Sequence, residues 1–244
     1  MKRNVLLIIG MMLFLLIGIT TAIGADDKNS NIITDIDGNS YSTITIGSQT
    51  WTVENLRTTH YNDGTEIPLI TGDTEWSNLK KGGYCCYDND KNENKDTYGA
   101  LYNWYAINTG KLAPKGWHVP TDAEWDTLQN YLIANGYNYD GSTDSNKIAK
   151  SLASQTDWQT YSITGTIGCN VIANGNSGFS ALPGGCRDRD GSFNGIGSSG
   201  YWWTATESRA SFAFNRYLGY TISYLTSDYY KKSCGLSVRL LRDN

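Results

Sequence analysis

The chain has 244 residues, a formal net charge of −4 and 39% hydrophobic residues. A mildly acidic chain without a Lys/Arg cluster is a poor binder of nucleic acid and of anionic membranes. The 26 Gly and 17 Tyr favour a loop-rich domain with half-buried strands, and the length suits a single core.

The N-terminus has the layout of a cleaved secretory signal. Lys2 and Arg3 form a short positive region, and a long apolar run is followed by small residues and then by acidic ones. The run is shorter than the roughly 20 residues of a spanning helix, and no Cys follows it to accept a lipid. We expect residues 1–24 to be removed, residues 25–34 to be a linker, and residues 35–244 to form one domain. The product would be secreted or held at the cell surface, with no membrane span.

The domain is expected to open with a β-hairpin. Polar and apolar residues alternate over residues 41–46, and residues 49–56 provide a returning strand. Gly47 and Ser48 fit the central positions of a type II′ turn. Further on, Leu101, Trp104 and Tyr105 have the i, i+3, i+4 spacing of a short amphipathic helix within residues 98–108.

The stretch GWHVPTDAEWDTL, residues 116–128, is rich in groups that can do chemistry. Thr121 and Glu124 match a capping box, which predicts a helix from there to a stop at Gly136. Each polar residue except His118 therefore has a local structural role, and His118 is expected to be a hydrogen-bonded packing residue. The stretch is interpreted as architecture. A third helix is expected within residues 144–154.

Several long motifs resemble one family of exported bacterial domains. The segments TYGALYNWYAINTGKLAPKGWHVPTDAEWDTL, GFSALPGGCRDRDGSF, GYWWTATE and CGLSVRLLRD resemble the Fibrobacter succinogenes major paralogous domain, over Asp35 to Asp243. Within them, VPTDAEWDTL and GLSVRLLR are similar to landmarks of the formylglycine-generating enzymes, which have a C-type-lectin-like fold. This resemblance implies an α+β domain with two or three helices and short antiparallel sheets. It also implies terminal strands that lie close together and long loops on one face.

No catalytic residues are assigned. The resemblance implies copper-binding thiols between GYWWTATE and CGLSVR, but that segment contains no Cys. A three-His iron site is excluded because the chain has only His60 and His118. We expect a non-catalytic binding domain whose partner is an extracellular glycan or protein. The alternatives are an unconventional glycan-cleaving enzyme, which needs only two facing carboxylates, and a structural component of a surface layer or pilus.

Five cysteines are present, and export makes disulfides permissible. In the family that the chain resembles, positions 186 and 234 are usually Tyr. That both are Cys here implies that the two sites touch and form a Cys186–Cys234 disulfide. The pairing of Cys85, Cys86 and Cys169 is left open.

One polar loop, residues 88–96, is a candidate calcium site. Asp88, Asp90, Asn92 and Asp96 recur at even spacing, and oxygen ligands spaced in this way can wrap Ca²⁺. The loop lacks the Gly and Glu positions of an EF-hand, so the alternative is a solvated loop without a cofactor.

The C-terminal third carries the binding candidates, because exposed rings can stack on sugars or anchor a protein partner. The candidate ligand-binding residues are Trp203, Tyr224, Tyr229, Tyr230 and Arg187. Trp202, Phe212 and Phe214 are expected to fill the core instead. The run from Arg187 to Asp190 is expected to form a turn with solvated ion pairs.

Overall fold

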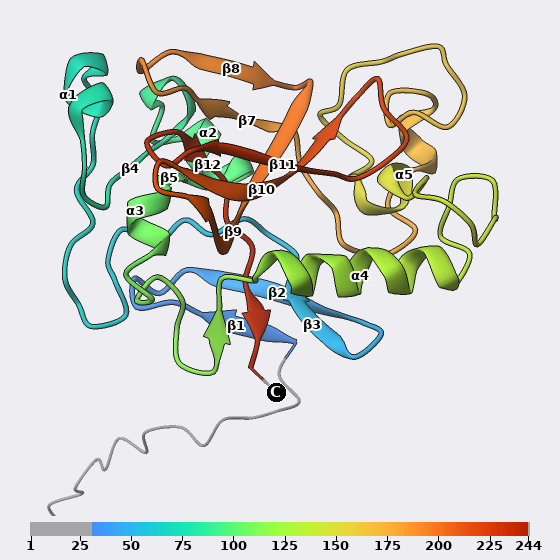
Figure 1. The fold of residues 1–244 in the computed structure, drawn as a ribbon, viewed down its shortest axis with the longest axis horizontal. Coiled ribbons are helices and arrows are strands. Elements are labelled where there is room, and N and C mark those ends of the chain that lie inside the picture. The colour runs from blue at the N-terminus through green and yellow to red at the C-terminus, as the bar shows by residue number, and fades with distance from the viewer. Residues whose placement is uncertain (1–30, 244) are drawn as a thin grey trace, which may run out of the picture. The chain divides into compact units, whose positions relative to one another are not determined.

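The computed structural model describes residues 31–243, which form a mixed α+β fold with two sheets (Figure 1). The predicted signal and the first part of the predicted linker lie outside these residues. Ile32–Thr34 already form strand β1, so regular structure begins before the expected boundary at residue 35. Within the described residues, no helix combines the length and the apolar character that crossing a membrane requires.

The smaller sheet contains both ends of the described chain. Its order is β1-β2-β3-β13-β6. The other strands are β2 (Ser40–Ile46), β3 (Gln49–Thr52), β6 (Trp117–His118) and β13 (Leu241–Arg242). The predicted hairpin is confirmed as β2 and β3, with Thr45 opposite Thr50. Gly47 has a φ of +64° and Ser48 does not adopt a positive φ, as a type II′ turn requires.

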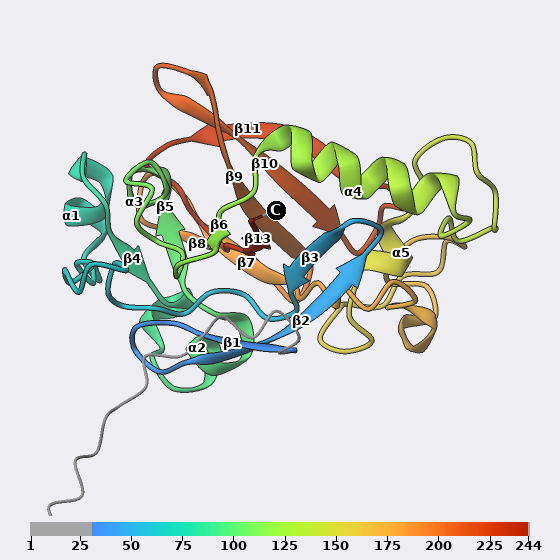
Figure 2. The same ribbon diagram turned by 90° about the horizontal axis from the view of Figure 1, so that it is seen from below.

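The larger sheet has eight strands, and Figure 2 shows the fold from below. Its path is β11-β10-β9-β7-β12-β5-β4, with β8 paired to β7. The strands are β4 (Tyr84–Cys85), β5 (Leu101–Asn103), β7 (Gly184–Arg187), β8 (Phe193–Ile196), β9 (Ser199–Arg209), β10 (Phe212–Gly219), β11 (Thr226–Lys231) and β12 (Gly235–Leu236). The antiparallel meander β9-β10-β11 is the longest part and places β11 at the sheet edge.

The described chain has five α-helices, of which only α4 exceeds two turns. They are α1 (Asp73–Asn78), α2 (Glu93–Tyr98), α3 (Trp104–Ile107), α4 (Asp122–Ala134) and α5 (Ala149–Leu152), with 3₁₀ turns at Tyr87–Asn89 and Val171–Ala173. The helix expected within residues 144–154 is therefore only α5.

The helix predicted within residues 98–108 is confirmed only over Trp104–Ile107, which form α3, and is wrong before them. Leu101–Asn103 form β5, which pairs with β4 and β12, and all three residues are buried. The helix α3 begins only at Trp104, because the Asn103 side chain caps it and accepts the N–H of Ala106 at 3.1 Å. Pairing with strands far away in the sequence overrides the local spacing.

The prediction for α4 is confirmed. Thr121 Oγ1 accepts the N–H of Glu124 at 3.3 Å, and Glu124 Oε2 accepts the N–H of Thr121 at 2.7 Å. The helix ends at Ala134, two residues before Gly136. It packs through Trp125, whose ring centroid lies 4.8 Å from Trp51.

Aromatic rings and buried arginines hold the two sheets together. Trp202 is buried as expected, whereas Phe212 and Phe214 are only half-buried, because their end of β10 extends to the surface. Arg239 is fully buried and binds the chain at three places, through Asn55 Oδ1, the carbonyl of Thr52 and the carbonyl of Phe179.

Candidate functional site

A pocket of about 440 Å³ brings together two distant parts of the chain, the β7–β8 turn and the end of β11. We call it the tyrosine pocket. Its lining residues are Asp188, Arg189, Asp190, Tyr229, Tyr230, Lys231 and Cys234. Two of the predicted binding residues, Tyr229 and Tyr230, thus line one cavity.

The turn that forms one wall is rigid because its polar groups are paired locally. Asp188 donates its N–H to the Ser192 carbonyl at 2.8 Å, and Gly191 donates to the Asp188 carbonyl at 3.0 Å. The carboxylate of Asp190 accepts both the N–H and the hydroxyl of Ser192. By contrast, Arg189 is exposed and forms no ion pair within residues 31–243. Its guanidinium is therefore free to meet a ligand.

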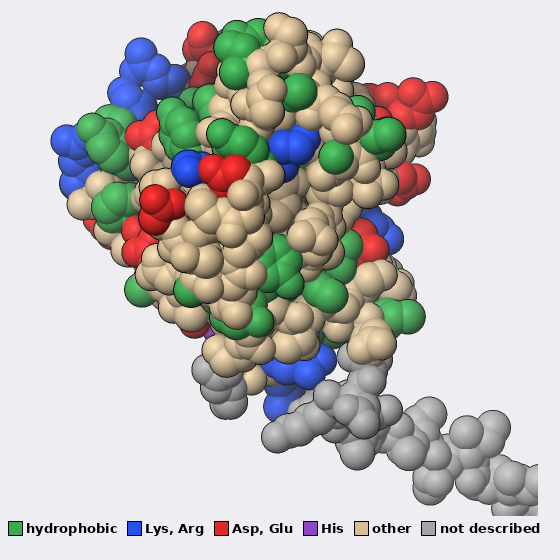
Figure 3. Space-filling model, turned by 90° about the vertical axis from the view of Figure 1, so that its right-hand side faces the viewer, with side chains coloured by type: hydrophobic (Ala, Val, Ile, Leu, Met, Phe, Trp, Pro, Cys, Tyr) green, Lys and Arg blue, Asp and Glu red, His purple; other side chains and the backbone are tan. Residues whose placement is uncertain are grey.

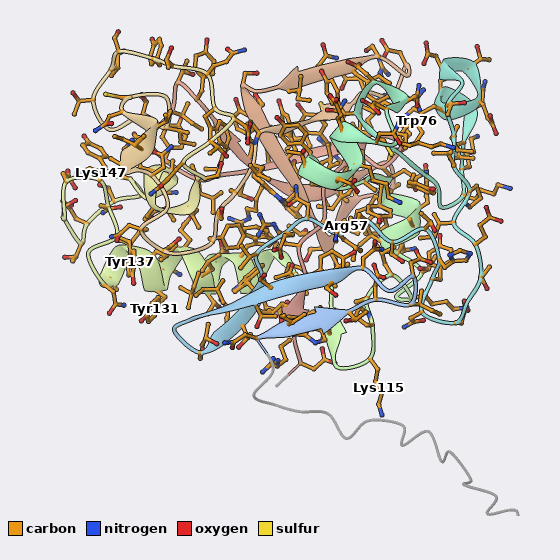
Figure 4. The ribbon with its side chains drawn as sticks, turned by 180° about the vertical axis from the view of Figure 1, so that it is seen from behind. Arg57, Trp76, Lys115, Tyr131, Tyr137 and Lys147 are labelled. Carbon is orange, nitrogen blue, oxygen red and sulfur yellow. The ribbon has the colours of Figure 1, made fainter. Side chains whose placement is uncertain are left out.

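Arg187 supports this turn from inside the protein. Its exposure is 0%, and its guanidinium donates to the carbonyls of Gly191 and Ile70 at 2.9 and 2.6 Å. It also stacks 4.7 Å above the ring of Trp76, the side chain labelled beside α1 in Figure 4. The expectation that Arg187 contacts a ligand is therefore wrong, because its side chain is fully buried. Its ion pair, with Asp73 of α1 at 2.9 Å, lies outside the run Arg187–Asp190 in which solvated ion pairs were expected.

The two tyrosines of β11 have different surroundings, as neighbours on a strand should. Tyr229 is 46% exposed and stands beside the guanidinium of Arg209, which lies 4.5 Å from its ring centre. Tyr230 is half-buried and packs on Tyr201 at 5.5 Å. Tyr229 is therefore partly exposed while its ring also packs against Phe212 at 5.7 Å, and Tyr230 anchors the strand.

The remaining two ring candidates do not line the tyrosine pocket. Trp203 has an exposure of 0%, and its indole N–H donates to the Tyr102 carbonyl at 2.8 Å, so it is a core residue and not a ligand contact. Tyr224 is 47% exposed but lies outside the tyrosine pocket. Sequence reasoning missed Asp188, Arg189, Asp190 and Lys231 as site residues. The alternating charges next to a turn-forming Gly were the available signal.

Residues 44–242 match the family model of the Fibrobacter succinogenes major domain. The chain belongs to this family. The match covers α4, the tyrosine pocket and both sheets except β1 and the first four residues of β2. No curated protein and no solved structure matches the chain. The family description names no ligand or activity, so the function of this Fibrobacter succinogenes major domain is argued from its own site.

The two carboxyl groups of the pocket have opposite electrostatic environments. Burial, together with the nearby charge of Asp190, raises the pKa of Asp188. Hydrogen bonds from Ser192 lower the pKa of Asp190. Asp188 thus holds its proton more readily than Asp190 does. Burial also raises the pKa of the Cys234 thiol to about 12, which keeps it protonated and weakly nucleophilic at neutral pH.

The expected Cys186–Cys234 disulfide is not formed, and the five cysteines of the described chain are unbridged. Strand β7 pairs with β12 through Arg187 and Gly235, so the two cysteines that precede these partners are diagonal neighbours. Diagonal neighbours lie about 7–8 Å apart, whereas disulfide-linked β-carbons lie ~3.5–4.5 Å apart. The two sites are close, but their register does not align the sulfur atoms.

The segment expected to bind calcium does not gather its oxygen ligands. Asp88 is exposed, and Asp90 uses its carboxylate to accept the N–H of Asn92 at 2.9 Å. The backbone is helical from Glu93 onward, so Asp96 lies in α2. The extended loop that ligands at alternate positions need is therefore not present there. Within the described part of the chain, no group of three or more His, Cys, Asp or Glu side chains is placed to hold a metal ion.

Proposed function

We propose that this domain is a non-catalytic binding module and that its tyrosine pocket binds a carbohydrate of an extracellular polymer. The observation that carries the proposal is that one cavity is lined both by Tyr229, which is 46% exposed, and by Arg189, whose guanidinium forms no ion pair in the described chain. Aromatic rings offer flat apolar faces, and guanidinium and carboxylate groups bond to hydroxyls. A sugar presents both an apolar ring face and hydroxyls.

Preorganisation supports this proposal. The turn that holds Asp188 and Asp190 is fixed by its own hydrogen bonds and by buried Arg187, so it loses little conformational freedom on binding. A protein partner is the other ligand class that exposed rings can serve. The carboxylates of Asp188 and Asp190 and the unpaired guanidinium of Arg189 favour a hydroxyl-rich ligand over an apolar protein surface.

We further propose that the fold is C-type-lectin-like and that the protein is secreted or displayed at the cell surface. The pairing of β13 with β3 supports the fold, since it brings the first and last strands into one sheet. N-terminal sequencing of the mature protein would test export, with Ala25 expected as the first residue. An experimental structure would test the fold assignment.

A glycan array followed by isothermal titration calorimetry tests the binding role. We expect saturable binding of at least one polysaccharide fragment, weakened about tenfold by Tyr229→Ala or Arg189→Ala, since a ring or a charged hydrogen bond contributes roughly 1–2 kcal/mol. Tyr224→Ala is the matched control, because this ring is equally exposed outside the pocket. Equal affinities for all three variants, or binding by none of the glycans, would contradict the proposal. Assembly of the pure protein into polymers would support the structural alternative instead.

The opposite pKa shifts of Asp188 and Asp190 favour glycan cleavage as the second candidate function. Glycosidases use a carboxyl group of raised pKa beside a second carboxyl group that stays ionised. The pKa of Asp188 is raised and that of Asp190 is lowered. Product formation from a bound glycan, lost in both Asp188→Asn and Asp190→Asn, would establish this function. Binding without turnover supports the non-catalytic role.

A further inference from the structure

A second, larger pocket of about 600 Å³ lies in the loops between α4 and β7. We call it the amide pocket, because four carboxamide side chains line it. Its lining residues are Tyr137, Asn138, Tyr139, Lys150, Ser151, Gln155, Ile172, Ala173, Asn174, Gly175 and Asn176. These loops and α5 form the right-hand end of the molecule in Figures 1 and 2, away from β8. Figure 3 faces that end, where hydrophobic side chains are dispersed among polar groups.

The floor of the amide pocket is built from paired groups. Asn174 is buried, and its amide donates to the carbonyls of Ser154 and Ile167 at 3.1 and 3.2 Å. Its side-chain oxygen accepts the Lys150 ammonium at 2.7 Å, and the N–H of Gly175 bonds to the Lys150 carbonyl. The loop that carries these residues is thus fixed onto α5 before any ligand arrives.

The rim of the same pocket offers unused groups. Asn176 is exposed, and its side chain forms no hydrogen bond with another residue of the stretch 31–243. Tyr139 is 43% exposed, and its ring lies against Gly165, where a β-carbon would approach within 2.4 Å. One face of this ring is therefore held in place while much of the side chain is open. Figure 4 places Tyr137 at this end of the molecule, close to Lys147.

The charged side chain that lines the amide pocket, Lys150, is positive. None of its lining residues is acidic, although the protein as a whole is. Lys150 donates to the Cys169 carbonyl at 2.6 Å and, at the longer distances of 3.4 and 3.3 Å, to the carbonyls of Thr166 and Asn170. These partners are all neutral, and Lys150 forms no ion pair among the described side chains. Lys147, by comparison, is neutralised by Asp140 at 2.7 Å.

We infer that the amide pocket is a second binding site and that it takes an acidic saccharide, a sugar that carries a carboxylate. The ring of Tyr139 would support the sugar face, and the amides of Asn176 and Gln155 would bond to hydroxyls. The carboxylate would lie towards Lys150, which can exchange one of its long contacts for it. Amides suit hydroxyls because both groups donate and accept hydrogen bonds. This site is independent of the tyrosine pocket, so either can exist without the other.

Calorimetric titration of the full chain with tetragalacturonic acid, and separately with its neutral methyl ester, tests this inference. We expect saturable binding of the acid, several-fold weaker binding of the ester, and weaker binding of the acid as salt increases. Asn176→Asp preserves the size of the side chain and adds a negative charge. It should weaken binding of the acid about tenfold and that of the ester far less. Tyr139→Ala should weaken binding of both ligands.

The controls separate this site from the tyrosine pocket and from misfolding. Tyr224→Ala should bind tetragalacturonic acid as the unmodified chain does, and the circular dichroism of every variant should match that of the unmodified chain. Loss of binding in Tyr229→Ala but not in Asn176→Asp would assign the acid to the tyrosine pocket and overturn the inference. Equal affinity for the acid and the ester, or no binding of the acid, would also overturn it.

Discussion

Arg239 connects separate segments of the chain through its hydrogen bonds. Its guanidinium is fully buried and donates to acceptors from β3, from residue 55 and from residues 179–180, while its face lies 4.8 Å from the ring centre of Phe179. Burial lowers its pKa to about 9. No carboxylate of the described chain pairs with it, so backbone and amide oxygens alone solvate a buried cation.

Replacing this side chain should be costly. Arg239→Met keeps much of the apolar volume but leaves several buried oxygens without hydrogen-bond donors. We therefore expect the free energy of unfolding to fall by about 3 kcal/mol. Urea denaturation followed by tryptophan fluorescence measures the change. Lys115→Met is the control, since Lys115 is exposed and points away from the fold in Figure 4. A loss no larger than that of the control would show that the hydrogen bonds of Arg239 are dispensable.

His118 makes stability depend on pH. Its ring nitrogens bond to Asp243 at 2.6 Å and to Glu124 at 2.9 Å. Burial alone would favour the neutral ring, but these hydrogen bonds outweigh burial and raise the pKa of His118. The pKa of His118 is higher in the folded than in the unfolded protein, so its protonation stabilises the fold. This stabilisation is complete below the unfolded pKa of about 6.5 and is lost as the pH rises through the folded pKa.

His118→Asn should therefore destabilise the protein more at pH 6 than at pH 8.5. Thermal melts of both proteins at the two pH values would show the difference, and Asp243→Asn should reproduce part of it. Parallel pH profiles for the original chain and for His118→Asn would contradict the assignment. The role expected from the sequence, a hydrogen-bonded packing residue, agrees with these contacts.

At the level of elements, α4 depends on the Thr121 cap. The hydroxyl accepts an N–H that the first helical turn would otherwise leave unpaired, and Asp122 bonds to the buried guanidinium of Arg216 at 2.6 Å. Thr121→Ala should reduce the free energy of unfolding by about 1 kcal/mol. Thr127→Ala, at an exposed position of the same helix, should change it by less than ~0.5 kcal/mol. Chemical denaturation of the two variants compares them directly.

The loop before α2 gives a prediction about calcium. Its oxygens are used in local turns or carried into a helix, so no ligand set is assembled there. Addition of 5 mM CaCl₂, on the order of the weakest extracellular sites, should leave the melting temperature unchanged. A rise that Asp90→Asn abolishes would restore the calcium hypothesis.

Elements with local signals could be predicted from the sequence. The cap of Thr121 and Glu124 and the turn at Gly47 depend on residues within a few positions of each other, and both were correct. Strand β5 could not be predicted, because Leu101 has helical spacing with Trp104 and Tyr105, and only its pairing with β4 and the pairing of Tyr102 with β12 make a strand. Long-range pairing decides such cases.

For the molecule as a whole, the site was only half predictable. Tyr229 stands out as a ring in a polar segment, but nothing local shows that Arg187 and Trp203 are buried while Arg189 is exposed. Those assignments depend on α1 and on β5, which lie far away in the sequence. The alternating charges of residues 187–190 predict a turn. Which of these side chains faces solvent depends on packing against distant parts of the fold.

The cysteines report on global unfolding. Cys85, Cys86, Cys186 and Cys234 are buried, and Cys169 is partly exposed. A thiol reagent at neutral pH should therefore modify Cys169 in the folded protein and all five only after denaturation, since burial raises the pKa of thiols such as Cys85. Mass mapping of labelled peptides measures this. Protection of Cys186 and Cys234 that persists in denaturant and is released by reductant would instead show a disulfide.

The position of β13 bears on how the protein is made. Leu241 pairs with both Trp51 and His118, so this short strand sits between β3 and β6 inside the smaller sheet. A nascent polypeptide that has reached only Arg239 still leaves the edges of those two strands without their common neighbour. The sheet therefore cannot close until the ribosome has released residues 241 and 242, and synthesis that stops before Leu241 yields a product with open strand edges, which invite aggregation.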